Sequence, residues 1–194
     1  MIRSTAVFLF STCLFSAASA QSALLGLRPD PKQAPVFFHA DDGRQAFRLP
    51  AEFHFAYWQT DDHDPVHLER DRTLYFLAFE QTPIVLKSAA LGFVLVDAQG
   101  RIADTLGYDY AAVGQFVGPF APARLNRGAR SVPRTVLLDK TGRQAFGGRV
   151  FYRARPFADG EVAVQTDGPN GPWLILNEQG NTVSSFPAES GKHI

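Results

Sequence analysis

The chain has 194 residues, and its 19 lysine and arginine residues balance 19 aspartate and glutamate residues, so the formal net charge at neutral pH is zero. Without a net positive charge there is no overall field that would attract DNA, RNA or an acidic membrane, and we expect no nucleic-acid partner. The length suffices for one domain with a hydrophobic core.

The first twenty residues have the pattern of a cleavable secretory signal peptide. A basic start at Arg3 precedes an apolar run from Ala6 to Phe15 and the small residues Ala18-Ser19-Ala20. The apolar run is shorter than the ~20 residues of a membrane-spanning helix, and no later segment supplies such a run, so we do not expect the chain to span a membrane. The only cysteine, Cys13, lies inside this segment. With arginine preferred to lysine, these features predict a bacterial protein that is periplasmic or extracellular after cleavage near Ala20.

The remaining chain divides by composition into three parts. We expect residues 21–35 to form an extended N-terminal segment and residues 36–188 to form a single β-rich domain, because strand and turn patterns begin at residue 36. Residues 189–194 are predicted to be a polar C-terminal tail.

A short apolar run followed by a polar turn with glycine occurs four times, which is typical of β-hairpins. In each turn an Asp or Asn side chain can accept hydrogen bonds from nearby backbone, and glycine can take the positive φ that closes the turn. The four instances are Val36–His39 before Asp41-Asp42-Gly43, Phe93–Val96 before Asp97-Ala98-Gln99-Gly100, Thr135–Leu138 before Asp139-Lys140-Thr141-Gly142, and Trp173–Leu176 before Asn177-Glu178-Gln179-Gly180.

Further strands are predicted at residues 53–60, 73–80, 83–87 and 161–166, where apolar residues alternate or run together. Only Tyr108 to Val117 has a spacing compatible with one short helix, limited by Gly114 and Gly118. The sequence therefore predicts an all-β, mostly antiparallel fold with at most one short helix, arranged as a two-sheet β-sandwich.

A small barrel or a repeat-type β fold is the alternative. The turn glycines Gly43, Gly100, Gly142 and Gly180 lie 57, 42 and 38 residues apart, and the pentapeptide Gly-Arg-Gln-Ala-Phe occurs at 43–47 and again at 142–146. Because the spacing is uneven and hairpin turns favour similar residues, the sandwich is the preferred interpretation.

The segment from residue 61 to residue 71 is rich in side chains that bind metals. Its carboxylates suit calcium, and two imidazoles with a carboxylate would suit zinc, copper or nickel. Pro65 interrupts any helix that would align the two histidines, and a solvated turn between strands explains the same composition. The candidate ligands for a divalent cation, the one cofactor considered, are Asp61, His63, Asp64 and His67.

A stretch without acidic residues runs from Tyr110 to Leu138 and carries regularly spaced arginines. Its glycines and prolines predict a long irregular loop. Guanidinium groups bind carboxylate, phosphate or sulfate, so an envelope glycan, a lipid head group or an acidic protein surface is a candidate partner. Pairing with the acidic segment 61–71 is the alternative role. The candidate ligand-binding residues here are Arg124, Arg127, Arg130 and Arg134.

Two tryptophans, Trp58 and Trp173, are candidates for stacking on sugar rings, although strands also need aromatic side chains for their core. The chain after residue 20 has no cysteine, no Gly-x-Ser-x-Gly, no His-Glu-x-x-His and no phosphate-binding glycine loop, so no catalytic residue is assigned. We predict a binding function, as an envelope accessory or interaction module with a glycan or protein partner. The alternatives are a small hydrolase, either metal-assisted or using a carboxylate pair such as Glu52 with Asp97, and an inhibitor or immunity-type protein.

Overall fold

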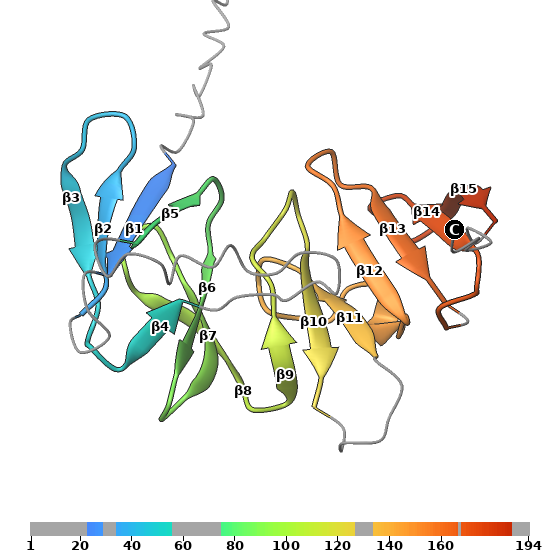
Figure 1. Ribbon diagram of the computed structural model, residues 1–194, viewed down its shortest axis with the longest axis horizontal. Coiled ribbons are helices and arrows are strands. Elements are labelled where there is room, and N and C mark those ends of the chain that lie inside the picture. The colour runs from blue at the N-terminus through green and yellow to red at the C-terminus, as the bar shows by residue number, and fades with distance from the viewer. Residues whose placement is uncertain (1–22, 29–33, 56–74, 127–133, 167, 188–194) are drawn as a thin grey trace, which may run out of the picture.

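The computed structural model describes residues 23–28, 34–55, 75–126, 134–166 and 168–187, and these form antiparallel strands in four sheets with one 3₁₀ turn, η2 (Phe146–Gly148) (Figure 1). In order across each sheet, sheet 1 contains β3 (Gln45–Arg48), β2 (Val36–His39), β1 (Leu24–Arg28) and β5 (Tyr75–Phe79), and sheet 2 contains β4 (Phe53–Phe55), β6 (Ile84–Ser88), β7 (Gly92–Val96) and β8 (Ile102–Gly107). Sheet 3 contains β11 (Thr135–Leu138), β10 (Ala121–Leu125) and β9 (Tyr110–Val113), and sheet 4 contains β12 (Arg153–Pro156), β13 (Val162–Gln165), β14 (Trp173–Leu176) and β15 (Thr182–Phe186).

The prediction of an all-β, mostly antiparallel fold is confirmed, and the first strands of the four predicted hairpins are β2, β7, β11 and β14. The sheets pack face to face as in a sandwich, but there are four of them where two were predicted. No closed barrel forms among the described strands. Within the same part of the chain, no helix is both long enough and apolar enough to cross a membrane.

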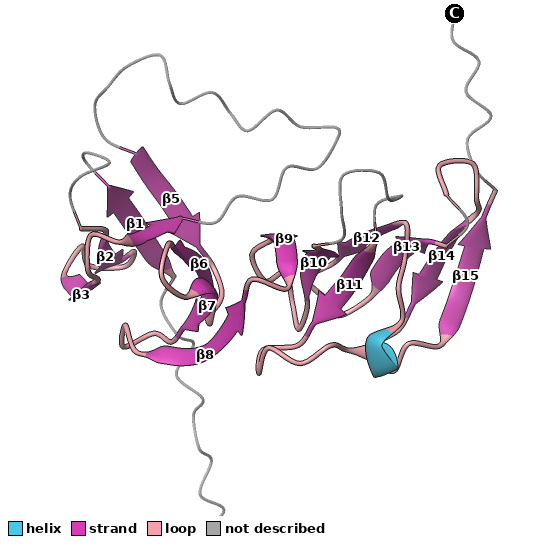
Figure 2. Cartoon of the chain, turned by 90° about the horizontal axis from the view of Figure 1, so that it is seen from below, coloured by secondary structure: helices cyan, strands magenta, loops and turns pink. Residues whose placement is uncertain are grey.

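The four sheets form a stack along the long axis of the molecule, with a separate hydrophobic core between each successive pair (Figures 1 and 2). Sheets 1 and 2 enclose a core that includes Phe37 and Leu86, sheets 2 and 3 one that includes Leu95 and Val136, and sheets 3 and 4 one that includes Leu137 and Val164. Sheets 2 and 3 therefore have both faces covered, whereas sheets 1 and 4 each have one face turned away from the stack.

Strand β7 shows how the sequence builds this arrangement. Its side chains alternate between two cores, because Val94 and Val96 pack toward sheet 1 while Phe93 and Leu95 pack toward sheet 3. All five residues of β7 are buried. The unbroken apolar run is thus the signature of a sheet covered on both faces.

Sheets 1 and 2 are also linked by the chain path. One edge strand of sheet 1 is β5, which follows β4 of sheet 2 in the sequence and precedes β6 of sheet 2. Strand β5 thus belongs to sheet 1, where it pairs with β1 over five residues. Sheet 1 therefore takes its fourth strand from a part of the sequence that lies between two strands of sheet 2.

Three hairpin turns close with the same hydrogen bonds. Asp97 Oδ1 accepts from the backbone N–H groups of Gln99 and Arg101, both at 2.9 Å, and Asn177 Oδ1 accepts in the same way from the residues two and four positions later. Asp139 Oδ1 repeats the pattern. The predicted turn chemistry is therefore confirmed.

Two of the turn glycines lie at close contacts between successive sheets. A Cβ atom on Gly100 would lie 2.6 Å from the ring of Phe47, and one on Gly180 would lie 2.8 Å from the ring of Phe146. Phe47 lies four residues after Gly43, and Phe146 lies four residues after Gly142. Each phenylalanine is thus the last residue of one copy of the recurring pentapeptide. The pentapeptide thus has a structural role, in which its phenylalanine supports the turn of the next sheet.

Two local predictions between residues 108 and 138 are wrong. The segment predicted as a helix contains strand β9, in which Tyr110 and Val113 face the same core. They do so because Ala111 forms a β-bulge, as an extra residue with no partner between Arg124 and Leu125 of β10. The bulge produces a three-residue spacing that resembles a helix.

The predicted long loop contains β10, the central strand of sheet 3. Pro122 of this strand pairs with Leu137, and its carbonyl accepts a 2.8 Å hydrogen bond from the Gly114 N–H. Because this hydrogen bond needs no donor from the proline, the strand tolerates Pro122.

Sheets 2 and 3 are further connected through one amide side chain. Gln115 Oε1 accepts from the Val85 N–H at 2.9 Å, and Gln115 Nε2 donates to the Val85 carbonyl at 2.8 Å. Val85 is fully buried, and β4 ends one pair short of it, since Phe55 pairs with Leu86. The glutamine therefore takes the place of a neighbouring strand at this position.

Candidate functional site

The outer face of sheet 4 is the candidate site. Directly paired residues of antiparallel strands place their side chains on the same face. Core residues Val162, Val164 and Leu176 face sheet 3, so the alternating positions face away from the stack. The outward face therefore carries two rows across the four strands, which are Arg153, Gln165, Trp173 and Phe186, and Arg155, Ala163, Ile175 and Ser184.

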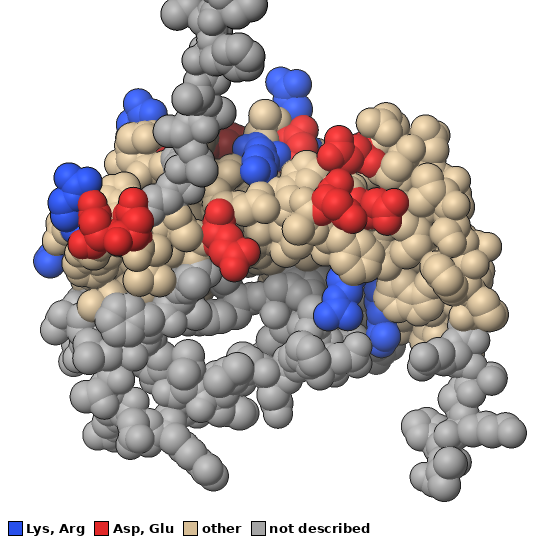
Figure 3. Space-filling view, turned by 90° about the horizontal axis from the view of Figure 1, so that it is seen from above, with Lys and Arg blue, Asp and Glu red and all other residues tan. Residues whose placement is uncertain are grey.

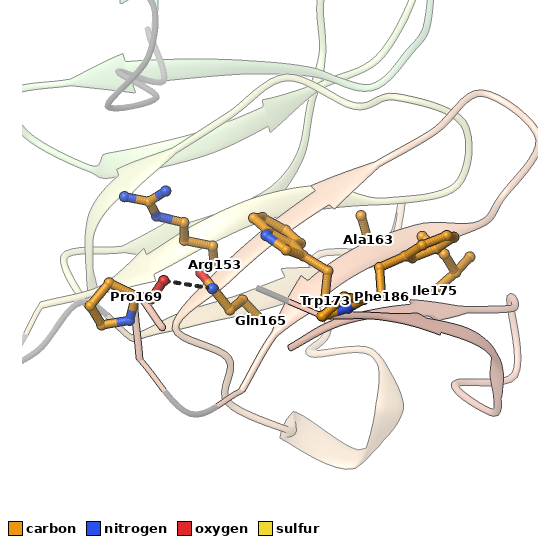
Figure 4. Close-up of a pocket in the computed structure, with 8 residues that line it drawn as sticks. Arg153, Ala163, Gln165, Pro169, Trp173, Ile175 and Phe186 are labelled. Carbon is orange, nitrogen blue, oxygen red and sulfur yellow. Dashed lines mark hydrogen bonds between the residues drawn. The ribbon is translucent and has the colours of Figure 1, made fainter. Parts of the chain in front are cut away.

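A pocket of about 540 Å³ opens on this face (Figure 4). Such a volume lies in the range of small-molecule sites. None of the lining residues is acidic, and one is cationic. The lining consists of Arg153, Ala163, Gln165, Pro169, Trp173, Ile175, Phe186 and Pro187.

Gln165 forms the polar part of this lining. Its Nε2 donates to the carbonyl oxygens of Pro169 at 3.0 Å and Gly171 at 2.8 Å, which fixes the loop between β13 and β14 against the sheet. These two bonds also fix the orientation of the amide. The residue is only 2% exposed, so its Oε1 is buried. Within the described part of the chain this oxygen has no hydrogen-bond partner. An unpaired buried acceptor costs ~1–3 kcal/mol, so this oxygen calls for an explanation.

Aromatic and cationic groups lie on the two sides of Gln165. Trp173 is half-buried and is followed on β15 by Phe186, which is 52% exposed. On the other side, Arg153 lies on β12, and its guanidinium carbon is 5.4 Å from the centre of the Tyr152 ring. The arrangement offers an aromatic surface, a buried amide and a positive charge to a bound molecule.

Of the predicted ligand-binding residues, Trp173 lies in the pocket. Arg124 is an exposed residue of β10, and Arg134 is a half-buried residue just before β11 whose carbonyl accepts from the Leu125 N–H at 2.9 Å. Both belong to sheet 3 or its border, and neither lines the pocket. Arg127, Arg130 and Trp58 lie outside the described residues.

The predicted metal ligands Asp61, His63, Asp64 and His67 also lie outside the described residues. Within the described ranges, no group of three or more His, Cys, Asp or Glu side chains could hold a metal ion.

Asp97, a member of the suggested carboxylate pair, closes the β7–β8 turn and forms a 2.8 Å ion pair with Arg101. Glu52, the other member, is exposed.

The aspartates of the turns are held in their charged form. Burial alone would raise the pKa of the Asp139 carboxyl, but hydrogen bonds from Thr141 and Arg143 outweigh it, and the pKa lies below its usual value. The pKa of Asp97 is lowered by the same balance, in which bonds from Arg101 and Gln99 outweigh burial. A depressed pKa favours a structural carboxylate over a general acid.

Sequence reasoning missed Arg153, Gln165, Ile175 and Phe186. The alternating Arg-Ala-Arg of β12 could have indicated a strand with basic residues on one face. Gln165 gave no signal, because its role depends on the loop that folds back over it.

Comparison with models of known protein families found no match to this chain, and a search among curated proteins found no relative either. The functional argument therefore depends on the site itself.

Proposed function

We propose that this protein is exported to the bacterial envelope and acts there by binding, as an accessory or interaction module that holds its partner on the outer face of sheet 4. The observation that carries the proposal is the pocket around Trp173 on a sheet face that no other described sheet covers. The signal-peptide pattern of residues 1–20 supports the location.

The composition of this face supports a binding role. In stacked architectures each unit covers the next, and terminal units need a polar outer face to stay soluble. Sheet 4 instead presents Trp173, Ile175 and Phe186 on its outer side. Besides Arg153 and Arg155 the two rows carry no charged residue, and few charged side chains gather at this end of the molecule in the view of Figure 3. Concave apolar sites with a few polar groups are typical of ligand-binding surfaces.

Thermal unfolding of the protein with fractionated envelope material tests the proposal. The fractions are envelope polysaccharide and envelope protein, and each variant is compared with its own unliganded midpoint. A partner that binds only the folded state stabilises it by ~2.7 kcal/mol at one hundred times its dissociation constant. We expect one fraction to raise the midpoint of the unmodified protein but not that of Trp173→Ala.

Phe157→Ala is the matched control, because Phe157 is another exposed aromatic residue next to sheet 4 that does not line the pocket. This variant should keep the full shift. An equal shift in Trp173→Ala, or no shift with any fraction, would contradict binding at this face.

A further inference from the structure

The chemistry of the pocket on sheet 4 specifies its ligand more closely. Resting on the function proposed above, we propose that the pocket binds an acidic saccharide, with a sugar ring stacked on Trp173 and a sugar carboxylate paired with Arg153. The occupant is thus a glycan that carries uronic-acid-type groups, and neither a neutral glycan nor a second copy of the chain.

The geometry of the row supports an elongated ligand. Arg153, Gln165, Trp173 and Phe186 are consecutive partners on the four strands of sheet 4. Because neighbouring strands lie ~4.8 Å apart, the row extends over about 14 Å from β12 to β15. A ligand that crosses the strands would meet aromatic surface at one end and a positive charge at the other (Figure 4).

The aromatic end suits a sugar ring. The C–H face of a pyranose is apolar while its rim carries hydroxyl groups, so it can cover Trp173 and leave its hydroxyls directed toward polar neighbours. Phe186 and Ile175 extend the apolar surface beside the indole. A flat, half-buried indole next to an exposed phenyl ring therefore offers a stacking platform.

The amide beside Trp173 fits a ligand with hydroxyl groups. Gln165 Nε2 is engaged by Pro169 and Gly171, whereas Oε1 accepts no hydrogen bond from any described residue. Since Oε1 is covered by neighbouring protein atoms, a ligand hydroxyl must displace them to donate to it. Such a bond would satisfy the acceptor, and hydroxyl-rich ligands supply many donors.

The charge of the face favours an anion. Arg153 lines the pocket and Arg155 lies on the same face, while no acidic residue belongs to either row. A carboxylate is matched in shape and charge by a guanidinium, and the pair excludes ligands of the wrong charge.

The same charges argue against a second copy of the chain as the occupant. Two sheet 4 faces packed with β12 against β12 would bring Arg153 and Arg155 of both copies close to each other. Arg48, the exposed partner of the buried Val36 in sheet 1, would oppose Arg153 in a head-to-tail contact that placed the two side by side. Like charges across an interface are unfavourable.

Isothermal titration calorimetry of the purified protein with oligogalacturonate, and with the same oligosaccharide as its methyl ester, tests the proposal. The two probes share the same sugar chain and differ at the carboxyl groups, which are charged in the acid and are neutral methyl esters in the second probe. We expect the acid to bind and the ester to bind at least about tenfold more weakly, since the ester loses the charged hydrogen bond to Arg153 and a tenfold change in affinity corresponds to about 1.4 kcal/mol.

Variants locate the site. Trp173→Ala and Arg153→Gln should each weaken oligogalacturonate binding about tenfold or more. Arg143→Gln is the matched control, because Arg143 is an exposed arginine of the sheet 3 turn, and it should bind as the unmodified protein does. Circular dichroism of each variant checks the fold, and Arg153→Gln keeps the test open if Trp173→Ala unfolds.

The outcomes separate this inference from the function on which it rests. Equal binding of acid and ester overturns the anionic part. If neither probe binds but a glutamate-rich peptide binds and loses affinity in Trp173→Ala, the ligand class is wrong while binding at sheet 4 stands. Both the acidic-saccharide proposal and binding at sheet 4 fail if Trp173→Ala and Arg153→Gln bind the two probes and the peptide as the unmodified protein does. Both also fail if neither the probes nor the peptide bind.

Discussion

Substituting alanine for two turn glycines should separate backbone strain from sheet stacking. Gly43 and Gly100 have similar positive φ values, 68° and 79°, but a Cβ atom on Gly43 would meet nothing within 4 Å, whereas one on Gly100 would lie 2.6 Å from the Phe47 ring. The difference reflects the position in the stack, because the Gly43 turn belongs to the first sheet and has no sheet before it.

The expected magnitudes follow from these two terms. A non-glycine residue in the left-handed region costs ~1–2 kcal/mol, so Gly43→Ala should lower the free energy of unfolding by about that amount. Gly100→Ala should cost ~1–3 kcal/mol more, because overpacking displaces the buried Phe47 ring, which stacks on Phe37 at 4.6 Å between centroids.

Urea unfolding monitored by circular dichroism measures both free energies, with an unchanged denaturant dependence as the check that the comparison is valid. A double-mutant cycle adds Phe47→Ala. Because the shortened side chain leaves room for the new methyl group, the double variant should be more stable than the sum of the single effects by ~1–3 kcal/mol. Equal costs for Gly43→Ala and Gly100→Ala would refute the stacking argument.

Two further predictions concern sheet linkage and acid stability. Gln115→Leu removes the hydrogen bonds to both buried backbone groups of Val85 and should lower the free energy of unfolding in urea by about 2–6 kcal/mol. Gln179→Leu, at an exposed position, is the control and should change this free energy little. Comparable losses in the two variants would contradict the linkage between sheets 2 and 3. The pKa of Asp139 is lower in the folded protein than its unfolded value of ~3.9, so its stabilisation is complete above that value and is lost as the pH falls through the folded pKa. Asp139→Asn can still accept the turn hydrogen bonds, as Asn177 does in its own turn. The variant should therefore lose less stability than the unmodified protein on acidification below about pH 4. An unchanged acid-unfolding profile would show that the Asp139 carboxylate does not contribute to acid stability.

The local elements could be predicted because their chemistry is local. The strand from Thr135 to Leu138 is an apolar run, and Asp139 and Gly142 end it with bonds to residues at most four positions away. Such signals depend on the backbone of a few neighbours. The same reasoning failed at Tyr110 and Val113, where a bulge opposite β10 produced helical spacing within a strand.

The candidate site could be predicted only in part. Trp173 was singled out for its side chain, but its neighbours Arg153 and Gln165 come from strands β12 and β13 and join it only through the pairing register of sheet 4. Gln165 Oε1 accepts no hydrogen bond from any described residue, because a loop holds the rest of the amide. No spacing in the sequence encodes that combination.

The sequence by itself determined the all-β class, the antiparallel hairpins and their turn residues, because alternation and turn chemistry act over short distances. Only the tertiary structure decided that four sheets form a stack, with β5 crossing back to complete sheet 1 and the phenylalanines of the recurring pentapeptide packed against later turn glycines. These choices depend on which apolar faces cover one another, a non-local competition that a linear pattern does not specify. The face of sheet 4 that no other described sheet covers, and with it the candidate site, follows from that competition.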